Sequence, residues 1–217
     1  MYGKEILQEA VSHHPESVPA KVLLDNFHHF VGIHDALTDG WVYGWGSYMF
    51  NGKDYVYQRE TLKKQEALFR VGQASTNILE VGVYVGHSLL ILLLSNPNLK
   101  ITCIDIDEKC APKVVKYLNQ HFNNRVTFIL GDAVTVMKTL PDNAYDMIHI
   151  DADHNIPAVT EQFTEARRLA KPNAFIVFDD YEALRAIIDF WINTETLSHV
   201  TTPWCLWTNI VTKILNK

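Results

Sequence analysis

Three aspartates follow two apolar runs in the second half of the chain, and their spacing predicts a site for a divalent cation. Asp151 comes directly after the run 144–150, and the pair Asp179 and Asp180 follows the run 173–178. If these runs are neighbouring parallel strands, they lie ~4.8 Å apart and end at the same edge of the sheet. Carboxylates so close together raise one another's pKa values, and Mg²⁺ or another divalent cation relieves that repulsion.

Two residues beside the first of these carboxylates could act as a base. His154 stands three residues after Asp151, and Asp153 stands two residues after it. An imidazole, with an ordinary pKa of ~6.5, is suited to taking a proton near neutral pH. We therefore predict His154 as the catalytic base and Asp153 as the second candidate. The alternative for His154 is an ordinary residue at a helix N-terminus.

The other histidines are expected to serve the fold. His149 alternates onto a strand and is expected to be buried or packed, and His87 would at most touch a bound cofactor. The pairs 13–14 and 28–29 have no partner at a useful spacing, so both pairs are expected on the surface.

An earlier stretch joins an apolar run to an amphipathic run through two glycines, which predicts a ligand-binding turn. The run 77–81 ends at Gly82, Gly86 follows four residues later, and 87–95 has helical character. Glycines let the backbone approach a ligand, and the helix N-terminus presents free N–H groups. The spacing differs from the Gly-x-Gly-x-x-Gly fingerprint, which argues against a dinucleotide pyrophosphate on this turn.

Two further aspartates end the apolar runs that come next. Asp105 ends the run that begins at residue 100, ~20 residues past the glycines, where an acidic side chain accepts hydrogen bonds from a ribose diol. Asp132 follows the run 125–130, and it could also cap a helix over 132–139. Acids thus recur at successive strand ends.

An alternation of strands and helices must position these residues. Short connections between them predict a parallel, doubly wound α/β sheet, and largely apolar strands fit a sheet covered on both faces. Two β-rich runs near the end, 199–202 and 206–214, could close the sheet as an antiparallel pair. The predicted strands are 77–81, 100–104, 125–130, 144–150 and 173–178, and the predicted helices are 87–95, 108–121, 132–139, 155–170 and 182–191.

The first 76 residues differ from the rest. Residues 5–11 and 18–31 have helical spacing, and 59–71 predicts a helix that Gly72 ends. The segment 41–57 is rich in aromatic residues and glycine. It either packs the N-terminal part onto the sheet or forms a lid over a pocket.

We treat residues 1–76 as a helical and aromatic-rich appendage of the same domain as the core, 77–217. A chain of 217 residues with 47% apolar residues suffices for one domain with a full core.

The glycine turn resembles motif I of the class I S-adenosylmethionine-dependent methyltransferases, in which an acidic residue precedes the first glycine, as Glu80 does here. The run 82–88, Gly-Val-Tyr-Val-Gly-His-Ser, is similar to the catechol O-methyltransferase group. The resemblance implies a Rossmann-like seven-stranded sheet and S-adenosyl-L-methionine as cofactor. It also implies cofactor contacts from Glu80, Gly82, Tyr84, Gly86, Ser88, Asp105, Asp132, Ala133 and Asp151.

The aspartates after the fourth and fifth strands resemble those of the metal-dependent O-methyltransferases, both catechol-type and sugar-modifying. This resemblance implies Asp151, Asp179 and Asp180 as metal ligands. Mg²⁺ would acidify and position a hydroxyl of a small molecule for direct methyl transfer. At the position of His154, catechol-type enzymes have a lysine and some sugar-modifying enzymes a histidine. Asp153 stands where catechol enzymes have a tryptophan, which favours a more polar acceptor, such as a sugar or a polyol-bearing metabolite.

Three other functions stay open at this point. A nicotinamide-dependent oxidoreductase could use a similar sheet, but the glycine spacing and the Asp179-Asp180 pair disfavour it. A nucleotide-sugar transferase could use Asp151-Ala152-Asp153 as an Asp-x-Asp motif, although the glycine turn would then have no role. A protein that binds S-adenosylmethionine without catalysis would need neither the acidic residues nor a base.

The composition of the chain disfavours some classes of binding partner and location. The net charge is −6 and no basic block is present, which disfavours nucleic acid. No signal peptide is apparent, and no apolar run approaches the ~20 residues that a membrane span requires. The three cysteines have no metal-binding spacing and leave an odd one under any pairing, which suggests reduced thiols and a cytoplasmic location. The oligomeric state is left open.

Overall fold

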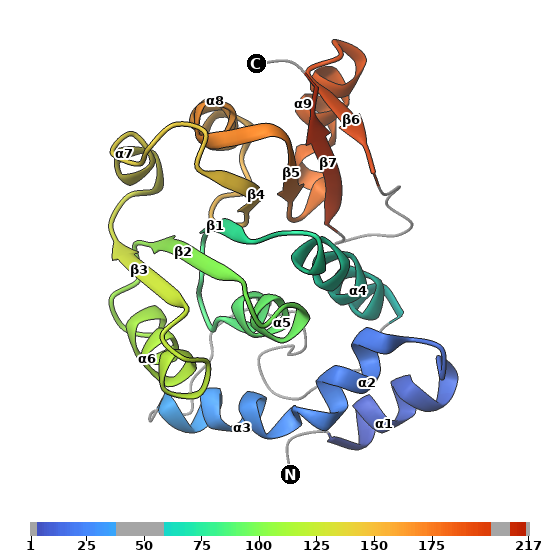
Figure 1. Ribbon diagram of the computed structural model, residues 1–217. Helices are drawn as coiled ribbons and strands as arrows, with labels where there is room; N and C mark the ends of the chain where they lie inside the picture. The colour runs from blue at the N-terminus through green and yellow to red at the C-terminus, as the bar shows by residue number, and fades with distance from the viewer. Residues whose placement is uncertain (1–3, 38–58, 201–208, 216–217) are drawn as a thin grey trace.

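A seven-stranded sheet forms the centre of the computed structural model, which describes residues 4–37, 59–200 and 209–215. The strand order is β3-β2-β1-β4-β5-β7-β6, and β1 to β5 run parallel while β7 is antiparallel to both β5 and β6 (Figure 1). The predicted doubly wound sheet with a closing antiparallel pair is therefore confirmed. The strands are β1 (Asn77–Val81), β2 (Lys100–Asp105), β3 (Val126–Leu130), β4 (Tyr145–Ile150), β5 (Ala170–Phe178), β6 (Leu197–His199) and β7 (Ile210–Ile214).

Helices cover both faces of the sheet. One layer contains α4, α5 and α6, the opposite layer contains α7, α8 and α9, and α1 to α3 pack outside the first layer (Figure 1). The helices are α1 (Lys4–His13), α2 (Val18–Asp25), α3 (Phe27–Ala36), α4 (Arg59–Gln73), α5 (His87–Ser95), α6 (Ala111–His121), α7 (Ala133–Met137), α8 (Ile156–Leu169) and α9 (Tyr181–Asn193).

Most predicted helices differ from the observed ones by a few residues at their ends, and two differences have a structural cause. The expected helix over 18–31 is divided at Asn26, where the backbone leaves the helical region and α3 begins. Helix α4 continues through Gly72 to Gln73. A Cβ on Gly72 would lie 2.3 Å from Ser95 Oγ, so this glycine lets α4 cross α5 closely and does not end the helix.

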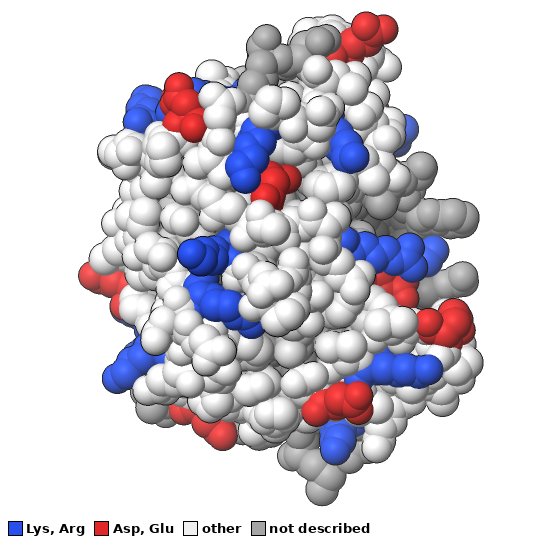
Figure 2. Space-filling model, in the orientation of Figure 1, with Lys and Arg blue, Asp and Glu red and all other residues white. Residues whose placement is uncertain are grey.

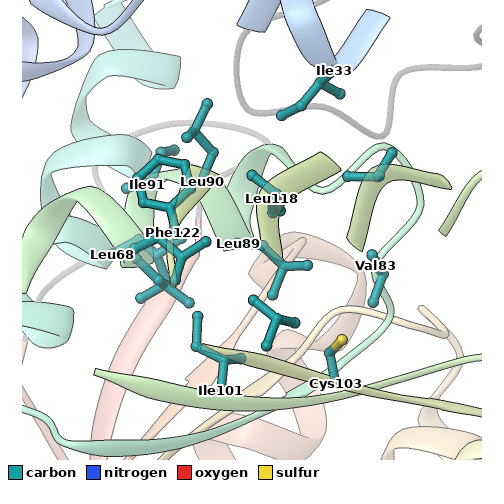
Figure 3. Close-up of a cluster of buried hydrophobic side chains, with 14 of the residues drawn as sticks. Ile33, Leu68, Val83, Leu89, Leu90, Ile91, Ile101, Cys103, Leu118 and Phe122 are labelled. Carbon is teal, nitrogen blue, oxygen red and sulfur yellow. The ribbon is translucent and has the colours of Figure 1, made fainter. Parts of the chain in front are cut away.

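Apolar side chains form one cluster on each face. The cluster beneath α5 includes Ile78 of β1. Figure 3 shows two further members, Ile101 of β2 and Leu89 of α5. The opposite cluster includes Leu79 and other side chains from β1, β4 and β5. Because neighbouring residues of β1 enter opposite clusters, both faces of this central strand are buried, as its apolar sequence requires.

The N-terminal helices share the first of these clusters. Leu23, Phe30 and Ile33 are fully buried in the same group as Leu89 and Leu90 of α5. They therefore pack directly onto the helical layer of the core. The possible lid, 41–57, lies outside the described residues.

His29 is a correction to the expectation that both histidine pairs lie on the surface. Its side chain is buried between α3 and α6, where Nδ1 lies 3.1 Å from the Tyr117 hydroxyl and the ring packs against Phe122. Burial, followed by the nearby His28 and His121, lowers the pKa of His29 to about 4.

The surface charge, the helix lengths and the cysteines bear on the remaining expectations from the sequence. Acidic and basic side chains are interspersed on the face shown in Figure 2. Over the ranges that the structure describes, no helix is long and apolar enough to cross a membrane. Cys103 and Cys110 are free thiols, whereas Cys205 and much of the predicted tail pair, 201–208, lie outside these ranges.

Candidate active site

A cavity of about 460 Å³ opens at the carboxyl edge of the parallel strands. The turns that follow β1 to β4 line it, together with His87 and Ser88 at the start of α5 and Gln162 of α8. The candidate residues from the sequence that line it are Gly82, Tyr84, Ser88, Asp105, Asp132, Ala133, Asp151, Asp153 and His154. Glu80 and Gly86 lie behind this lining.

The turns after β1 and β4 meet at Gly82. This residue has a φ of +96°, and a Cβ there would lie 2.3 Å from the backbone oxygen of Asp151. The Asp151 amide donates to the Val81 carbonyl at 2.8 Å, which fixes the two turns together. Only glycine combines this backbone angle with so close an approach. Gly86, with a φ of +67°, begins α5 against the Val114 side chain.

Asp105 holds the glycine turn. Its Oδ2 accepts hydrogen bonds from the amides of Val83 and Tyr84, at 2.6 Å and 2.8 Å, and its Oδ1 accepts from the Asp107 amide at 2.8 Å. Such charge-assisted bonds are strong. The carboxylate therefore fixes the wall of the cavity, and one lone pair, on Oδ1, is left to accept from a ligand hydroxyl.

Glu80 lies beneath the same turn and is fully buried. Its Oε1 accepts a hydrogen bond from Ser88 and lies 3.9 Å from His149 Nδ1. Its Oε2 has no hydrogen-bond partner among the described residues. A buried carboxylate oxygen without a partner is costly, so this atom is suited to a donor on a ligand or on water.

In the cavity wall itself, the Tyr84 hydroxyl and Gln162 Oε1 are buried polar atoms without a hydrogen-bond partner in the described part of the chain. Burial, then Cys110 and Asp107, raises the pKa of Tyr84 to about 12, so the phenol is neutral. Gln162 was not among the predicted residues. The available signal was its helical position, because it shares the buried face of α8 with Val159 and Phe163.

An acidic cluster, here defined as His149, Asp151 and Asp179, lies at the ends of β4 and β5. One ligand atom from each residue lies within 4.8 Å of the others. The parallel pairing of Ile150 with Phe178 brings the two aspartates together. Burial, followed by the charge of Asp179, raises the pKa of Asp151 well above its usual range. His149 was expected only to be buried, so its membership of this cluster was missed.

Lys64 of α4 enters this cluster from 115 positions away in the sequence. Its Nζ donates to Asp179 Oδ2 at 2.6 Å, and the two side chains are 13% and 6% exposed. Burial alone would lower the pKa of Lys64, but the carboxylates of Asp179 and Asp151 raise it. Burial alone would likewise raise the pKa of Asp179, but the Lys64 ammonium lowers it.

Asp180 and the two candidate bases lie beside the cluster. Asp180, with a φ of +45°, precedes α9, and its Oδ2 lies 3.6 Å from His154 Nε2. Burial and then Asp179 raise the pKa of Asp180. The His154 side chain is 42% exposed, and the exposed Asp153 accepts a hydrogen bond from Asn155.

Asp132 begins α7 as its N-cap, with its side chain accepting from the Thr135 amide at 2.9 Å. Asp132 therefore caps the helix, as the sequence suggested it could. It also lines the cavity.

The cavity can be compared with the needs of an organic cofactor, and the acidic cluster with those of a metal ion. The cavity suits a polar organic cofactor, because its wall presents buried acceptors without partners beside a turn fixed by glycine. Two carboxylates and an imidazole suit a divalent cation. The Lys64 ammonium already contacts one of these carboxylates, and Asp180 lies outside the group.

The sequence matches known proteins over this region. A family model described as a methyltransferase domain matches residues 79–181. A catechol O-methyltransferase from Niastella koreensis is 32% identical over 109 residues, which cover 48% of each chain. A caffeoyl-CoA O-methyltransferase from Stellaria longipes is 32% identical over 110 residues, covering 47% of this chain and 44% of the other. The chain thus spans about half the length of the curated relatives it matches.

The fold has known counterparts as well. The O-methyltransferase from Bacillus cereus, solved in complex with SAH, superposes with a TM-score of 0.57 at 20% identity. The match covers 71% of this chain and 80% of the other. At this identity the likeness concerns the fold alone.

Proposed function

We propose that this chain, whose residues 79–181 match the model of a methyltransferase domain and which resembles the class I S-adenosylmethionine-dependent enzymes, methylates a hydroxyl of a small molecule. The observation that carries the proposal is one continuous cavity. Its wall extends from the glycine turn at Gly82 to His154, which lies beside the acidic Asp180. A cofactor and an acceptor could therefore meet in it.

The cofactor end of the cavity is built from the turns after β1 to β3. S-adenosyl-L-methionine, when bound, supplies an electrophilic methyl group on sulfur. Asp105 would accept from a ribose hydroxyl through the one lone pair, on Oδ1, that the turn leaves unused. Glu80 Oε2 and Gln162 Oε1, which lack partners among the described residues, would accept from donors of the cofactor or its water. Asp132 and Ala133 would border the adenine.

The acceptor end lies at β4 and β5. We assign Mg²⁺ or a similar cation to Asp151 and Asp179, with Asp180 as the third predicted ligand and His149 as a further donor. Such a cation lowers the pKa of a coordinated hydroxyl and orients it. His154 would take the proton, and Asp180, 3.6 Å away, would orient its imidazole. Asp153 is the weaker candidate because its carboxylate already engages Asn155.

The first test is cofactor binding. The purified protein is titrated calorimetrically with S-adenosylhomocysteine and, in parallel, with NAD. Micromolar binding of the first and none of the second is expected, because the glycine turn lacks the dinucleotide spacing. Binding of NAD alone would instead favour the oxidoreductase.

The second test is methyl transfer from radiolabelled S-adenosylmethionine to a panel of catechols and polyols, with EDTA or Mg²⁺ present. Transfer that EDTA abolishes and Mg²⁺ restores is expected. Asp180→Ala should remove transfer while S-adenosylhomocysteine still binds; equal loss of both would contradict its assigned role. Binding of S-adenosylhomocysteine without transfer to any acceptor would favour a non-catalytic binder.

A further inference from the structure

A positively charged side chain of the protein, that of Lys64, contacts the acidic cluster of His149, Asp151 and Asp179. The Lys64 ammonium lies 2.6 Å from Asp179 Oδ2, and both side chains are largely buried. A buried carboxylate requires a partner of opposite charge. Here that partner comes from α4.

The position of Lys64 is set by the fold. Helix α4 is anchored by Leu62 and Leu68, which are 5% and 0% exposed. The buried Asn209, just before β7, donates its side-chain amide to the Lys64 carbonyl at 3.3 Å. The backbone is therefore fixed next to β7, and the ammonium reaches Asp179 on a flexible four-carbon stem.

A divalent ion and this ammonium compete for the same oxygen. Mg²⁺ takes oxygen ligands at about 2.0–2.1 Å. An ion that used Asp179 Oδ2 would therefore lie next to an ammonium that is 2.6 Å from the same atom. Like charges at that separation repel strongly where water is largely excluded. The stem of Lys64 can rotate away, whereas Asp151 and Asp179 are held by their strands.

We infer that Lys64 is an internal competitor for the metal position: its ammonium balances the acidic cluster when no metal is present, and a divalent cation binds by displacing it. This inference rests on the proposed function, which places the metal at Asp151 and Asp179. Lys64 thus weakens metal affinity, and it keeps the cluster intact when no metal is bound.

Metal affinity tests this directly. Mn²⁺ binding is measured by calorimetry on the wild type, on Lys64→Met and on Lys63→Met, which changes a neighbouring lysine of the same helix. Lys64→Met should bind Mn²⁺ at least tenfold more tightly than the wild type, and Lys63→Met within about twofold of it. Unchanged or weaker binding by Lys64→Met would overturn the inference, because removal of a competitor must raise affinity.

A second measurement needs no variant, in case Lys64→Met fails to fold. Acetylation of the wild type by acetic anhydride is followed at each lysine by peptide mass spectrometry. Saturating Mn²⁺ should raise the rate at Lys64 severalfold and leave Lys63 unchanged. An unaltered rate at Lys64, or no Mn²⁺ binding at all, overturns the inference. Binding of S-adenosylhomocysteine in the same samples shows whether the proposed cofactor function stands independently.

Discussion

The cofactor end of the cavity and the acidic end, here the acidic cluster that the cavity meets at Asp151, are built in different ways. At the cofactor end, Asp105 accepts hydrogen bonds from backbone amides of residues 83, 84 and 107, all within 22 positions of it. At the acidic end, Asp179 is held by an ammonium from 115 positions away. Negative charge is thus balanced by local backbone at one end and by a distant side chain at the other.

The cofactor end is therefore formed by the turn itself, whereas the acidic end depends on the packing of distant elements. The carboxylate of Asp105 stabilises the turn on which it lies. The pair of Lys64 and Asp179 forms only when α4 has packed beside the sheet. We therefore expect the acidic end to be the more sensitive to loss of a single side chain, and the cofactor end to be sensitive chiefly through its backbone.

The largest effect should come from Lys64→Met in the absence of metal. Removing one partner of a buried ion pair leaves the other charge uncompensated, which typically destabilises a protein by about 3–5 kcal/mol. Urea denaturation in EDTA measures the free energy of unfolding. Lys63→Met is the matched control and should change it by less than about 0.5 kcal/mol. A similar small change for Lys64→Met would mean that the ion pair contributes little, and the contrast between the two ends would fail.

Gly82→Ala should have the next largest effect, and it tests the backbone of the cofactor end. Alanine is strained at a φ of +96°, and its Cβ would lie 2.3 Å from the Asp151 backbone oxygen. We expect a loss of about 2–4 kcal/mol in stability together with much weaker S-adenosylhomocysteine binding. Thermal unfolding and calorimetry measure the two.

The control for this prediction is Gly72→Ala. That glycine lies within α4, away from the cavity, and a Cβ there would meet only side chains, first Ser95 Oγ. Cofactor affinity should be unchanged in this variant. If both variants bound S-adenosylhomocysteine normally, the close backbone approach at Gly82 would not be needed for cofactor binding.

The same contrast explains which features could be predicted from the sequence. Residues 77–81 and 87–95 were predicted at their observed bounds, because a run of apolar residues flanked by glycine is a local signal. The parallel sheet follows from the alternation of such runs, and its seven-stranded form was expected from the resemblance to the class I methyltransferases. Local patterns therefore suffice for most strands and helices and for the aspartates that end the strands.

Features that arise from packing could not be predicted in this way. Lys64 lies in the polar sequence Lys63-Lys64-Gln65-Glu66, which is typical of an exposed helix face, and nothing nearby indicates Asp179 as its partner. Gly72 resembled a helix end because glycine is common there, whereas a crossing helix requires it. His149 followed the expectation of burial, but its neighbours depend on the register of β4 against β5.

Asp105→Asn should have a smaller effect than the changes at Lys64 and Gly82. The substitution preserves size, but an amide nitrogen cannot accept a hydrogen bond, so at least one of the backbone amides of Val83, Tyr84 and Asp107 loses its acceptor. Losing a bond to a charged group costs about 1.5–3 kcal/mol. We expect that loss of stability and weaker S-adenosylhomocysteine binding. Full stability with weaker binding would instead assign Asp105 to the ligand alone.

The smallest effect is expected from Asp132→Ala, which separates a capping role from a binding role. The side chain is exposed and accepts from the Thr135 amide at 2.9 Å, and N-cap loss costs about 1 kcal/mol. Thermal unfolding should show that loss, and calorimetry should show weaker S-adenosylhomocysteine binding only if the carboxylate also contacts the cofactor. Asp132→Ser, which can still cap α7, distinguishes the two roles. If it restores stability but not affinity, the carboxylate binds the cofactor; if it restores both, the residue serves the cofactor end only through the helix, much as Asp105 serves it through the turn.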